Sequence, residues 1–242
     1  MKKILFIILC LFVLTGCSNK DENELVLVTE AGFAPYEYYD GDEIVGVDID
    51  IAKEIAKELG KKLVVRDVYF DSIINEINSG KADIAAAGMS ITPDRLKQVD
   101  FSMEYATSKQ ILVVKEESNM KISDINGKKV AVQLGSVADV ALSDTSSGEY
   151  KDITLIRQKK FLSGLLDVKN GNADCLVMDE LPAKELVNNN KGVKILDGYL
   201  FVDSYGMAVK KGNTELLETV NKVLQRLIDE GKIDEFTLNH SK

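Results

Sequence analysis

The chain has 242 residues, of which 45% are hydrophobic, and 39 acidic residues outnumber 30 basic ones. Such an acidic protein is a poor candidate for binding nucleic acid or for electrostatic attachment to anionic lipid. The single histidine, His240, stands close to the C-terminus, which argues against Ser-His-Asp or Cys-His catalysis and against a histidine-rich metal site. We therefore expect no catalytic residues, no metal and no cofactor.

The N-terminus has the pattern of an export signal. Two lysines precede an apolar run, residues 4–14, that is shorter than the roughly 20 residues a membrane span needs. The following Leu-Thr-Gly-Cys, ending at Cys17, resembles the lipobox of bacterial lipoproteins, in which the cysteine becomes the acylated first residue. An ordinary cleaved signal with an incidental cysteine is the alternative. We predict a signal peptide (1–16), a lipid-anchored linker (17–24) and a protein held at the extracytoplasmic face of the cell membrane.

Acylation of Cys17 leaves Cys175 as the only free thiol of the mature chain, so no intrachain disulfide can form. The mature chain has 28 basic and 39 acidic residues, a net charge of −11. Burial of apolar side chains must then hold the fold together, and about 220 residues can supply it.

Strand and helix patterns alternate in the first half of the chain. Thr92, Pro93 and Asp94 open one helix with a hydroxyl cap, a proline in the first turn and an acid near the positive end of the helix dipole. The predicted elements are strands at 25–29, 62–68 and 83–87, and helices from Asp48 or Asp50 to Gly60, from Asp71 to Gly80, and from Thr92.

The second half repeats this alternation, which is typical of the α/β class with parallel strands. A last amphipathic helix is capped by Asn213 or Thr214 and ends at Gly231. The other predicted elements are strands at 128–132, 153–156 and 174–178, and helices at 136–142, 161–169 and 180–187.

One segment occurs twice at an offset of 91 residues. SIINEINSGKADIAAAG (72–88) aligns without gaps on SGLLDVKNGNADCLVMD (163–179), so that Gly88 and Asp179 follow equivalent strands. Chance similarity between two α/β units is the alternative. If the repeat is real, the protein has two similar lobes, and both residues lie at carboxyl ends of strands, where open α/β sheets bind ligands.

Ser90 and Arg95 can form an anion site. A guanidinium grips a carboxylate through two parallel hydrogen bonds, and a hydroxyl and backbone N–H groups just past a strand end complete the site. Alternatively, Arg95 pairs with acids on its own helix and Ser90 is a cap.

The turn that contains Gly135 and Ser136 follows a strand and opens a helix, so its N–H groups can face a cleft or merely begin the helix. Asp179 can accept a hydrogen bond from an ammonium group or cap the next helix. The turn at Gly135 has a single glycine, which excludes a dinucleotide or phosphate-loop fingerprint.

Three residues of the first half are candidates for contact with a ligand side chain. Glu30 ends the first strand, and Phe33 and Phe70 lie in loops after strands, where two rings can enclose an aliphatic stem or a guanidinium. The alternatives are a solvated charge for Glu30 and core packing for both rings.

Together, these residues resemble the polar amino-acid substrate-binding proteins of ABC importers. The resemblance covers most of residues 25–209, and the most specific run is AGMSITPDR. The other stretches that carry it are TEAGFAPYEY, GVDIDIAKEIAKELG, YFDSIINEINSGKADIA, VAVQLGS and NADCLVMDE.

The resemblance implies a periplasmic-binding-protein-like (type II) fold of two hinged lobes, each a mostly parallel sheet flanked by helices, with the ligand in the cleft. Lobe 1 would comprise residues 25–107 and 205–242, and lobe 2 residues 108–204, with crossings near Ser108 and Ser204. A free amino acid, a membrane ABC permease and the lipid-anchored membrane would be the partners of a monomeric protein.

The resemblance also assigns roles to residues of this chain. Arg95 and Ser90 would hold the ligand carboxylate, with the N–H groups of Ser136 and Val137. Asp179 and the Gly88 carbonyl would take the ammonium group. Phe33 and Phe70 would flank the side chain and Glu30 would face its far end. The family often has Trp at position 70, and some members have a hydroxyl at position 88; neither departure removes a charge.

Glu30 favours a basic ligand: arginine, lysine, ornithine or histidine. Glutamine or cystine is the alternative, because relatives that bind other polar amino acids also carry an acid there. We expect a binding protein and not an enzyme. The rivals are a cyclohexadienyl dehydratase of the same fold, with Glu30 or Asp179 as general acid, and the sensor domain of a receptor.

Overall fold

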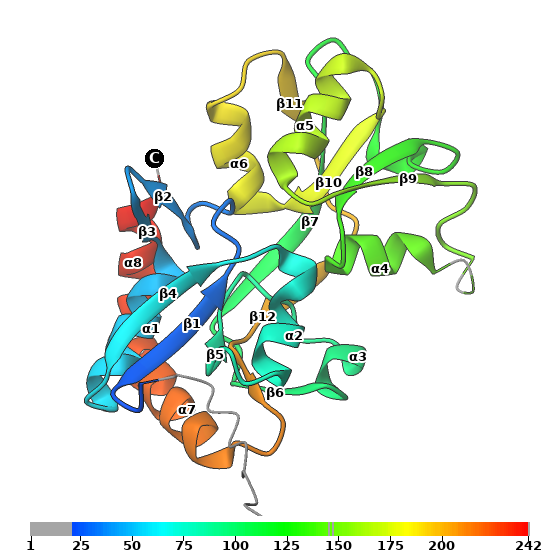
Figure 1. The fold of residues 1–242 in the computed structure, drawn as a ribbon. Coiled ribbons are helices and arrows are strands. Elements are labelled where there is room, and N and C mark those ends of the chain that lie inside the picture. The colour runs from blue at the N-terminus through cyan, green and yellow to red at the C-terminus, as the bar shows by residue number, and fades with distance from the viewer. Residues whose placement is uncertain (1–20, 145, 147, 242) are drawn as a thin grey trace, which may run out of the picture.

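Two sheets, each flanked by helices, lie one above the other in Figure 1. The computed structural model describes residues 21–144, 146 and 148–241. We use "lobe 1" for the five-stranded sheet with its helices and "lobe 2" for the six-stranded sheet with its helices. The α/β class and the division into two lobes, as predicted, are confirmed.

The sheet of lobe 1 has the order β4-β1-β5-β13-β6. Strand β1 pairs in parallel with β4 and β5, whereas β13 runs antiparallel to β5 and β6. The strands are β1 (Glu24–Thr29), β4 (Lys62–Asp67), β5 (Ile84–Ala85), β6 (Val99–Phe101) and β13 (Ala208–Lys210), and a hairpin of β2 (Tyr38–Asp40) and β3 (Glu43–Val45) lies beside them.

Helices cover both faces of this sheet because side chains along a strand point alternately to either face. Leu25 and Leu27 of β1 join a core with α1 and α7, and Val26 and Val28 join another core with α2. The helices are α1 (Val47–Glu58), α7 (Thr214–Asp229) and α8 (Lys232–His240) on one side, and η1 (Phe70–Ser72), α2 (Ile73–Asn78) and α3 (Pro93–Leu96) on the other (Figure 1).

The sheet of lobe 2 has the order β11-β7-β10-β8-β9, and β12 also pairs with β7. The strands are β7 (Ala106–Lys115), β8 (Lys129–Gln133), β9 (Thr154–Gln158), β10 (Cys175–Asp179), β11 (Val193–Ile195) and β12 (Val202–Tyr205). The helices are η2 (Ile122–Asp124), α4 (Val137–Ser143), α5 (Phe161–Asn170) and α6 (Glu180–Asn188).

Both sheets are mixed, which corrects the expectation of mostly parallel sheets. The parallel character holds for β4-β1-β5 in lobe 1 and for β10-β8-β9 in lobe 2. Strand β7 enters lobe 2, and β13 returns to lobe 1, in the direction opposite to these parallel strands, so their pairings are antiparallel. The alternation of helices and strands in the sequence predicts only the parallel part of each sheet.

Strands β7 and β12 form an antiparallel ribbon where the chain passes between the lobes (Figure 1). Ser108 is the register partner of Asp203, and Ser204 is the partner of Thr107. The predicted crossing points therefore lie side by side. The boundaries at 107/108 and 204/205 stay predictions, because both strands run through them without a break.

Two expected caps are wrong. Helix α1 begins after Gly46 with no side-chain cap, since Asp48 is fully buried and its Oδ2 accepts from the Gly88 N–H at 3.0 Å instead. Asp71 lies inside the short helix η1 and pairs with Lys159 of lobe 2, with 2.5 Å between Oδ2 and Nζ. Both acids serve tertiary contacts that local sequence does not reveal.

The caps of α3 and α7 are as predicted, and Ser136 caps α4: the side chains of Thr92, Ser136 and Asn213 each accept from a backbone N–H three residues on. Helix α7, however, is not the last helix. Gly231 adopts the left-handed conformation, with φ of 67°, and the chain continues into α8.

The repeat at an offset of 91 extends to individual hydrogen bonds. The Asp83 carboxylate accepts from the N–H of Val26 at 2.9 Å, and the Asp174 carboxylate accepts from the N–H of Lys129 at 2.8 Å. Gly80 and Gly171 both end their helices with positive φ, 74° and 79°. The two lobes thus share one helix-turn-strand unit, and Gly88 and Asp179 follow it in equivalent positions.

The one free cysteine of the described residues, Cys175, is buried in lobe 2, where burial raises its pKa to about 12. Cys17 and the predicted signal peptide lie outside the described residues. Between residues 21 and 241, apart from positions 145 and 147, no helix combines the length and the apolar character that crossing a membrane requires.

Candidate functional site

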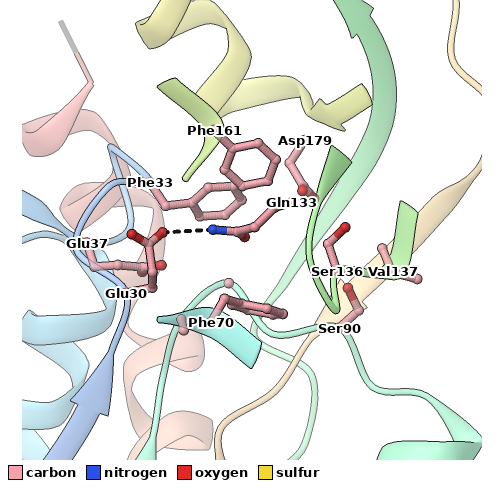
Figure 2. Close-up of a pocket in the computed structure, with 12 residues that line it drawn as sticks. Glu30, Phe33, Glu37, Phe70, Ser90, Gln133, Ser136, Val137, Phe161 and Asp179 are labelled. Atoms are coloured by element: carbon pink, nitrogen blue, oxygen red, sulfur yellow. Dashed lines mark hydrogen bonds between the residues drawn. The ribbon is translucent and has the colours of Figure 1, made fainter. Parts of the chain in front are cut away.

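A small cavity lies between the lobes. Residues of both lobes line it (Figure 2). They are Glu30, Phe33, Glu37, Phe70, Ala87, Gly88, Ser90, Gln133, Ser136, Val137, Phe161 and Asp179. Eight of the nine residues predicted to bind ligand are in this set, and the ninth, Arg95, lies directly behind it.

Arg95 is a buried cation without a counter-ion. It is 8% exposed, its Nη1 donates to the Ser90 carbonyl at 2.7 Å, and its Nη2 donates to the Gly135 carbonyl of lobe 2 at 3.0 Å. Among the described residues no carboxylate lies within ion-pair distance of it, and burial lowers the pKa of the guanidinium to about 10. Arg95 is still protonated at neutral pH, so an anion beside it would offset the cost of its burial.

The side chain of Ser90 is engaged from behind the cavity. Its hydroxyl donates to Asp203 of β12, and its backbone forms an isolated bridge with Tyr205. This arrangement ties the loop that carries Ser90 to the ribbon between the lobes. The Arg95 guanidinium also lies over the Phe70 ring, 5.2 Å from its centroid.

Ser136 and Val137 stand at the start of α4. The Ser136 hydroxyl accepts from the Asp139 N–H at 3.2 Å, and the Ser136 N–H donates to the Gln133 carbonyl at 3.1 Å. The Ser136 N–H is therefore already used in this structure, contrary to the role that the resemblance implies. The Val137 N–H has no acceptor within the helix, because it belongs to the first turn.

Asp179 faces the cavity from the end of β10. It is 7% exposed, and its Oδ1 accepts from the Tyr205 hydroxyl at 2.5 Å. Burial, and then the nearby charge of Asp203, raise the pKa of Asp179 to about 7. It occupies the N-cap position of α6 but makes no capping hydrogen bond, so the cap alternative is wrong.

Gly88 is a position that only glycine suits. Its φ is 50°, and a Cβ placed there would lie 2.4 Å from the Phe33 ring. Its N–H is held by Asp48, whose other oxygen accepts from the Tyr105 hydroxyl at 2.7 Å. The turn after β5 is thereby fixed beside the cavity.

Glu30 closes the opposite end of the cavity. It is 2% exposed, and its Oε2 accepts from Nε2 of Gln133 in lobe 2 at 3.1 Å, the dashed line in Figure 2. Its Oε1 lies 2.7 Å from Nζ of Lys160 but accepts no well-aligned hydrogen bond. This oxygen retains capacity for a further donor.

Aromatic rings form the walls. Phe33 stacks on Phe161 of lobe 2, with ring centroids 5.4 Å apart and an angle of 24° between the planes. Phe70 lies across the cavity from this pair (Figure 2). The two rings that the sequence singled out thus line one cavity, as expected, but the partner of Phe33 is Phe161.

Three lining residues with functional groups or rings were not predicted from the sequence. Phe161 stands 91 positions after Phe70, so extending the repeat by two residues would have found it. Gln133 ends β8 directly before the turn to α4. Neither oxygen of Glu37 accepts a hydrogen bond, and burial raises its pKa well above the usual range, next to Asp48. Burial thus favours the protonated form of Glu37, and no local sequence pattern marks this residue.

These groups suit a small zwitterion. Arg95 supplies positive charge at one end, and Asp179 and Glu30 supply acidic groups elsewhere around the same cavity. Within the described residues no cluster of three or more His, Cys, Asp or Glu side chains is arranged to hold a metal ion. A polar cavity between two α/β lobes, lined from both, defines a protein that encloses a small solute.

Comparison with known proteins gives the family. The chain belongs to the bacterial extracellular solute-binding proteins, family 3, whose model matches residues 25–240. Residues 1–18 match the prokaryotic membrane lipoprotein lipid attachment site, which confirms the predicted lipoprotein signal and membrane-anchored location.

Individual relatives cover nearly the whole chain. The arginine-binding extracellular protein ArtP of Bacillus subtilis is 33% identical over 97% of this chain and 96% of its own. The structure of AbpA of Streptococcus pneumoniae bound to L-arginine matches with a TM-score of 0.83 and 34% identity, over 90% and 94% of the two chains. An ancestral arginine-binding protein bound to glutamine matches with a TM-score of 0.80 and 38% identity, over 90% and 97%.

Proposed function

We propose that this protein captures a free basic amino acid, arginine foremost, and delivers it to an ABC permease. Family membership makes the protein the solute-binding component of an amino-acid ABC transporter, and its relatives are binding proteins without enzymatic activity. The observation that carries the ligand proposal is the placement of opposite buried charges at the two ends of the cavity: Arg95, which forms no ion pair with the described residues, and the Glu30 carboxylate.

The ligand carboxylate sits against Arg95, with the Ser136 hydroxyl and the Val137 N–H completing its surroundings, and the Ser90 hydroxyl joins them only by leaving Asp203. Two parallel hydrogen bonds from a guanidinium hold a carboxylate in one orientation. Displacing the Gly135 carbonyl from Nη2 frees one of those donors. This geometry recognises the part that all amino acids share.

The ligand ammonium group sits between Asp179 and the Gly88 carbonyl. A cation beside Asp179 favours its ionised form, which burial otherwise disfavours. Asp179 belongs to lobe 2 and Gly88 to lobe 1, so the ammonium group joins the lobes.

The ligand side chain runs between Phe33 and Phe70 toward Glu30. A guanidinium or ammonium at its end adds a further donor to the Glu30 carboxylate, and aromatic faces attract such cations. Arginine-binding relatives of this chain support that choice. Glutamine is the second candidate, because a relative of 38% identity is described with glutamine bound.

The ligand stabilises the closed form because only that form completes its contacts with both lobes. The closed population rises by the ligand's differential affinity for the two forms and by no more. The closed monomer, anchored by Cys17, then docks on the permease, which reopens it.

A panel of free amino acids tests this proposal. The mature protein is heated with each of the twenty amino acids, ornithine, citrulline or cystine, and the best ligands are measured by calorimetry. We expect arginine to give the largest rise in Tm, with lysine, ornithine or histidine next. A larger rise with glutamine or cystine than with every basic amino acid would contradict it.

A further inference from the structure

Lys160 does not itself line the cavity but contacts Glu30, which does. Its Nζ is 2.7 Å from Oε1 of Glu30 and 3.7 Å from Oδ2 of Asp67. The lysine immediately precedes α5 of lobe 2, whereas Asp67 ends β4 and Glu30 directly follows β1 in lobe 1. A cation of one lobe is thereby inserted between two carboxylates of the other.

The burial of these groups is unequal. The Glu30 side chain is 3% exposed and that of Asp67 is 25% exposed, whereas 38% of Lys160 reaches solvent. Asp67 also accepts from the Ala31 N–H at 2.8 Å and from the Tyr39 hydroxyl at 3.2 Å. Lys160 is thus the one cation in contact with Glu30 among the described residues, and the buried carboxylate meets the cavity already paired.

Pairing changes what Glu30 offers a ligand. A bare buried carboxylate attracts a cationic side chain strongly, but a carboxylate beside an ammonium group presents a dipole that also suits an amide. Gln133 has a similar effect on Glu30, because its amide donates to the second carboxylate oxygen at 3.1 Å. Two groups of lobe 2 therefore compensate a single charge of lobe 1.

We propose that Lys160 is a specificity-determining residue, which tempers the charge of Glu30 and so sets how strongly the cavity prefers a cationic to a neutral amino-acid side chain. This inference rests on the proposed function, because it assumes that the ligand side chain reaches Glu30. It adds that selectivity depends on a residue that does not line the cavity.

The neighbouring Lys159 provides a matched control. It also joins the lobes, with its Nζ 2.5 Å from Oδ2 of Asp71, and its side chain is 46% exposed. Its ammonium lies over the Tyr69 ring, 5.3 Å from the centroid, and not beside Glu30. Removing either lysine deletes one positive charge and its ion pairing between lobes, to Asp71 for Lys159 and to Glu30 and Asp67 for Lys160, but only the change at Lys160 alters the partner of Glu30.

The experiment compares Lys160→Gln and Lys159→Gln in the mature protein, with Kd for L-arginine and L-glutamine measured by calorimetry. Any loss of closure affects both ligands alike, so the ratio of the two Kd values isolates the charge effect. We expect Lys160→Gln to shift this ratio toward arginine by about tenfold, since a competing unit charge nearby is removed. Lys159→Gln and Lys160→Arg should leave it within about twofold.

A second comparison locates the effect at Glu30. In a Glu30→Gln background, adding Lys160→Gln should leave the ratio unchanged within about twofold, because no carboxylate remains there to be tempered. A shift in this background as large as in the wild type would overturn the proposal.

Other outcomes are equally decisive. Equal shifts for Lys159→Gln and Lys160→Gln, no shift for either, or a shift toward glutamine in Lys160→Gln would each reject the role of Lys160. Failure of the proposed function has a different signature: the wild type then binds glutamine more tightly than arginine, or neither. In the first case the ratio still reports on Lys160, and in the second its role falls with the proposed function.

Discussion

The two ends of the cavity handle charge in opposite ways. At the Arg95 end, formed by Ser90, Arg95, Ser136 and Asp179, the guanidinium is buried with only carbonyl acceptors. At the Glu30 end, formed by Glu30, Gln133 and Lys160, the carboxylate already has a cation 2.7 Å away. The unpaired guanidinium requires that every ligand carry an anion, whereas the paired carboxylate binds cationic and neutral ligand side chains with different affinities. Recognition of the shared backbone and selection of the side chain therefore use different electrostatic designs.

Arg95→Ala should remove the first design. We expect Kd for arginine and for glutamine to rise on the order of 10²–10³-fold, because the ligand carboxylate is then buried without its cation. Calorimetry measures both values. The variant without ligand should unfold cooperatively near the wild-type Tm, since among the described residues the Arg95 guanidinium donates only to the carbonyls of Ser90 and Gly135. Affinity kept within tenfold for either ligand would show that the carboxylate binds elsewhere.

Glu30→Gln should weaken arginine binding far more than glutamine binding, because it removes charge at the Glu30 end alone. We expect the arginine Kd to rise about 10–100-fold, the loss of a hydrogen bond to a charged group, while the glutamine Kd changes less than about threefold. Equal losses for the two ligands would mean that Glu30 does not face the side chain. The neutral amide keeps the shape of the carboxylate, so any change reports on charge.

The smallest expected effect is the dependence of arginine binding on pH. Asp179, whose pKa burial raises to about 7, must ionise to hold an ammonium group. Binding therefore releases a proton, and the arginine Kd should rise about fivefold as the pH falls from 7 to 6. Calorimetry in two buffers of different ionisation enthalpy measures the proton release directly. A Kd independent of pH between 6 and 8 would exclude Asp179 as the ammonium partner.

The same shift sets the stability of the ligand-free protein. The folded pKa of about 7 exceeds the ordinary value of 3.8, so the folded state holds an extra proton between these values. The contribution of Asp179 to the free energy of unfolding is thus fully present below pH 3.8 and is lost as the pH rises through 7. Asp179→Asn should remove this dependence and raise the Tm at pH 8.

Most of the Arg95 end could be predicted from the sequence because its residues follow strands. Ser90, Ser136 and Asp179 each come just after a strand or end one, and carboxyl ends of parallel strands share one edge. The family resemblance then gave each group a partner. The repeat could be recognised in the sequence because its two turns use equivalent aspartates to form equivalent hydrogen bonds.

The Glu30 end could not be predicted in the same way. Lys160 contacts a residue 130 positions earlier, and nothing in QKKF distinguishes it from Lys159. Asp48 looked like a helix cap because local rules favour an acid there, but it is drawn inward by the N–H of Gly88. Short antiparallel strands such as β12 and β13 are not followed by helices in the alternating pattern used for prediction. The ribbon between the lobes was therefore not predicted either.

The buried thiol of Cys175 has a practical consequence. A thiol with a pKa near 12 inside a sheet does not react with maleimides at neutral pH, because the thiolate is the reactive species. In a mature form that lacks the acylated N-terminus, cysteines introduced one on each lobe would then be the only labelling positions. A donor and acceptor dye pair attached there would follow opening and closing in single molecules, without first replacing a native residue.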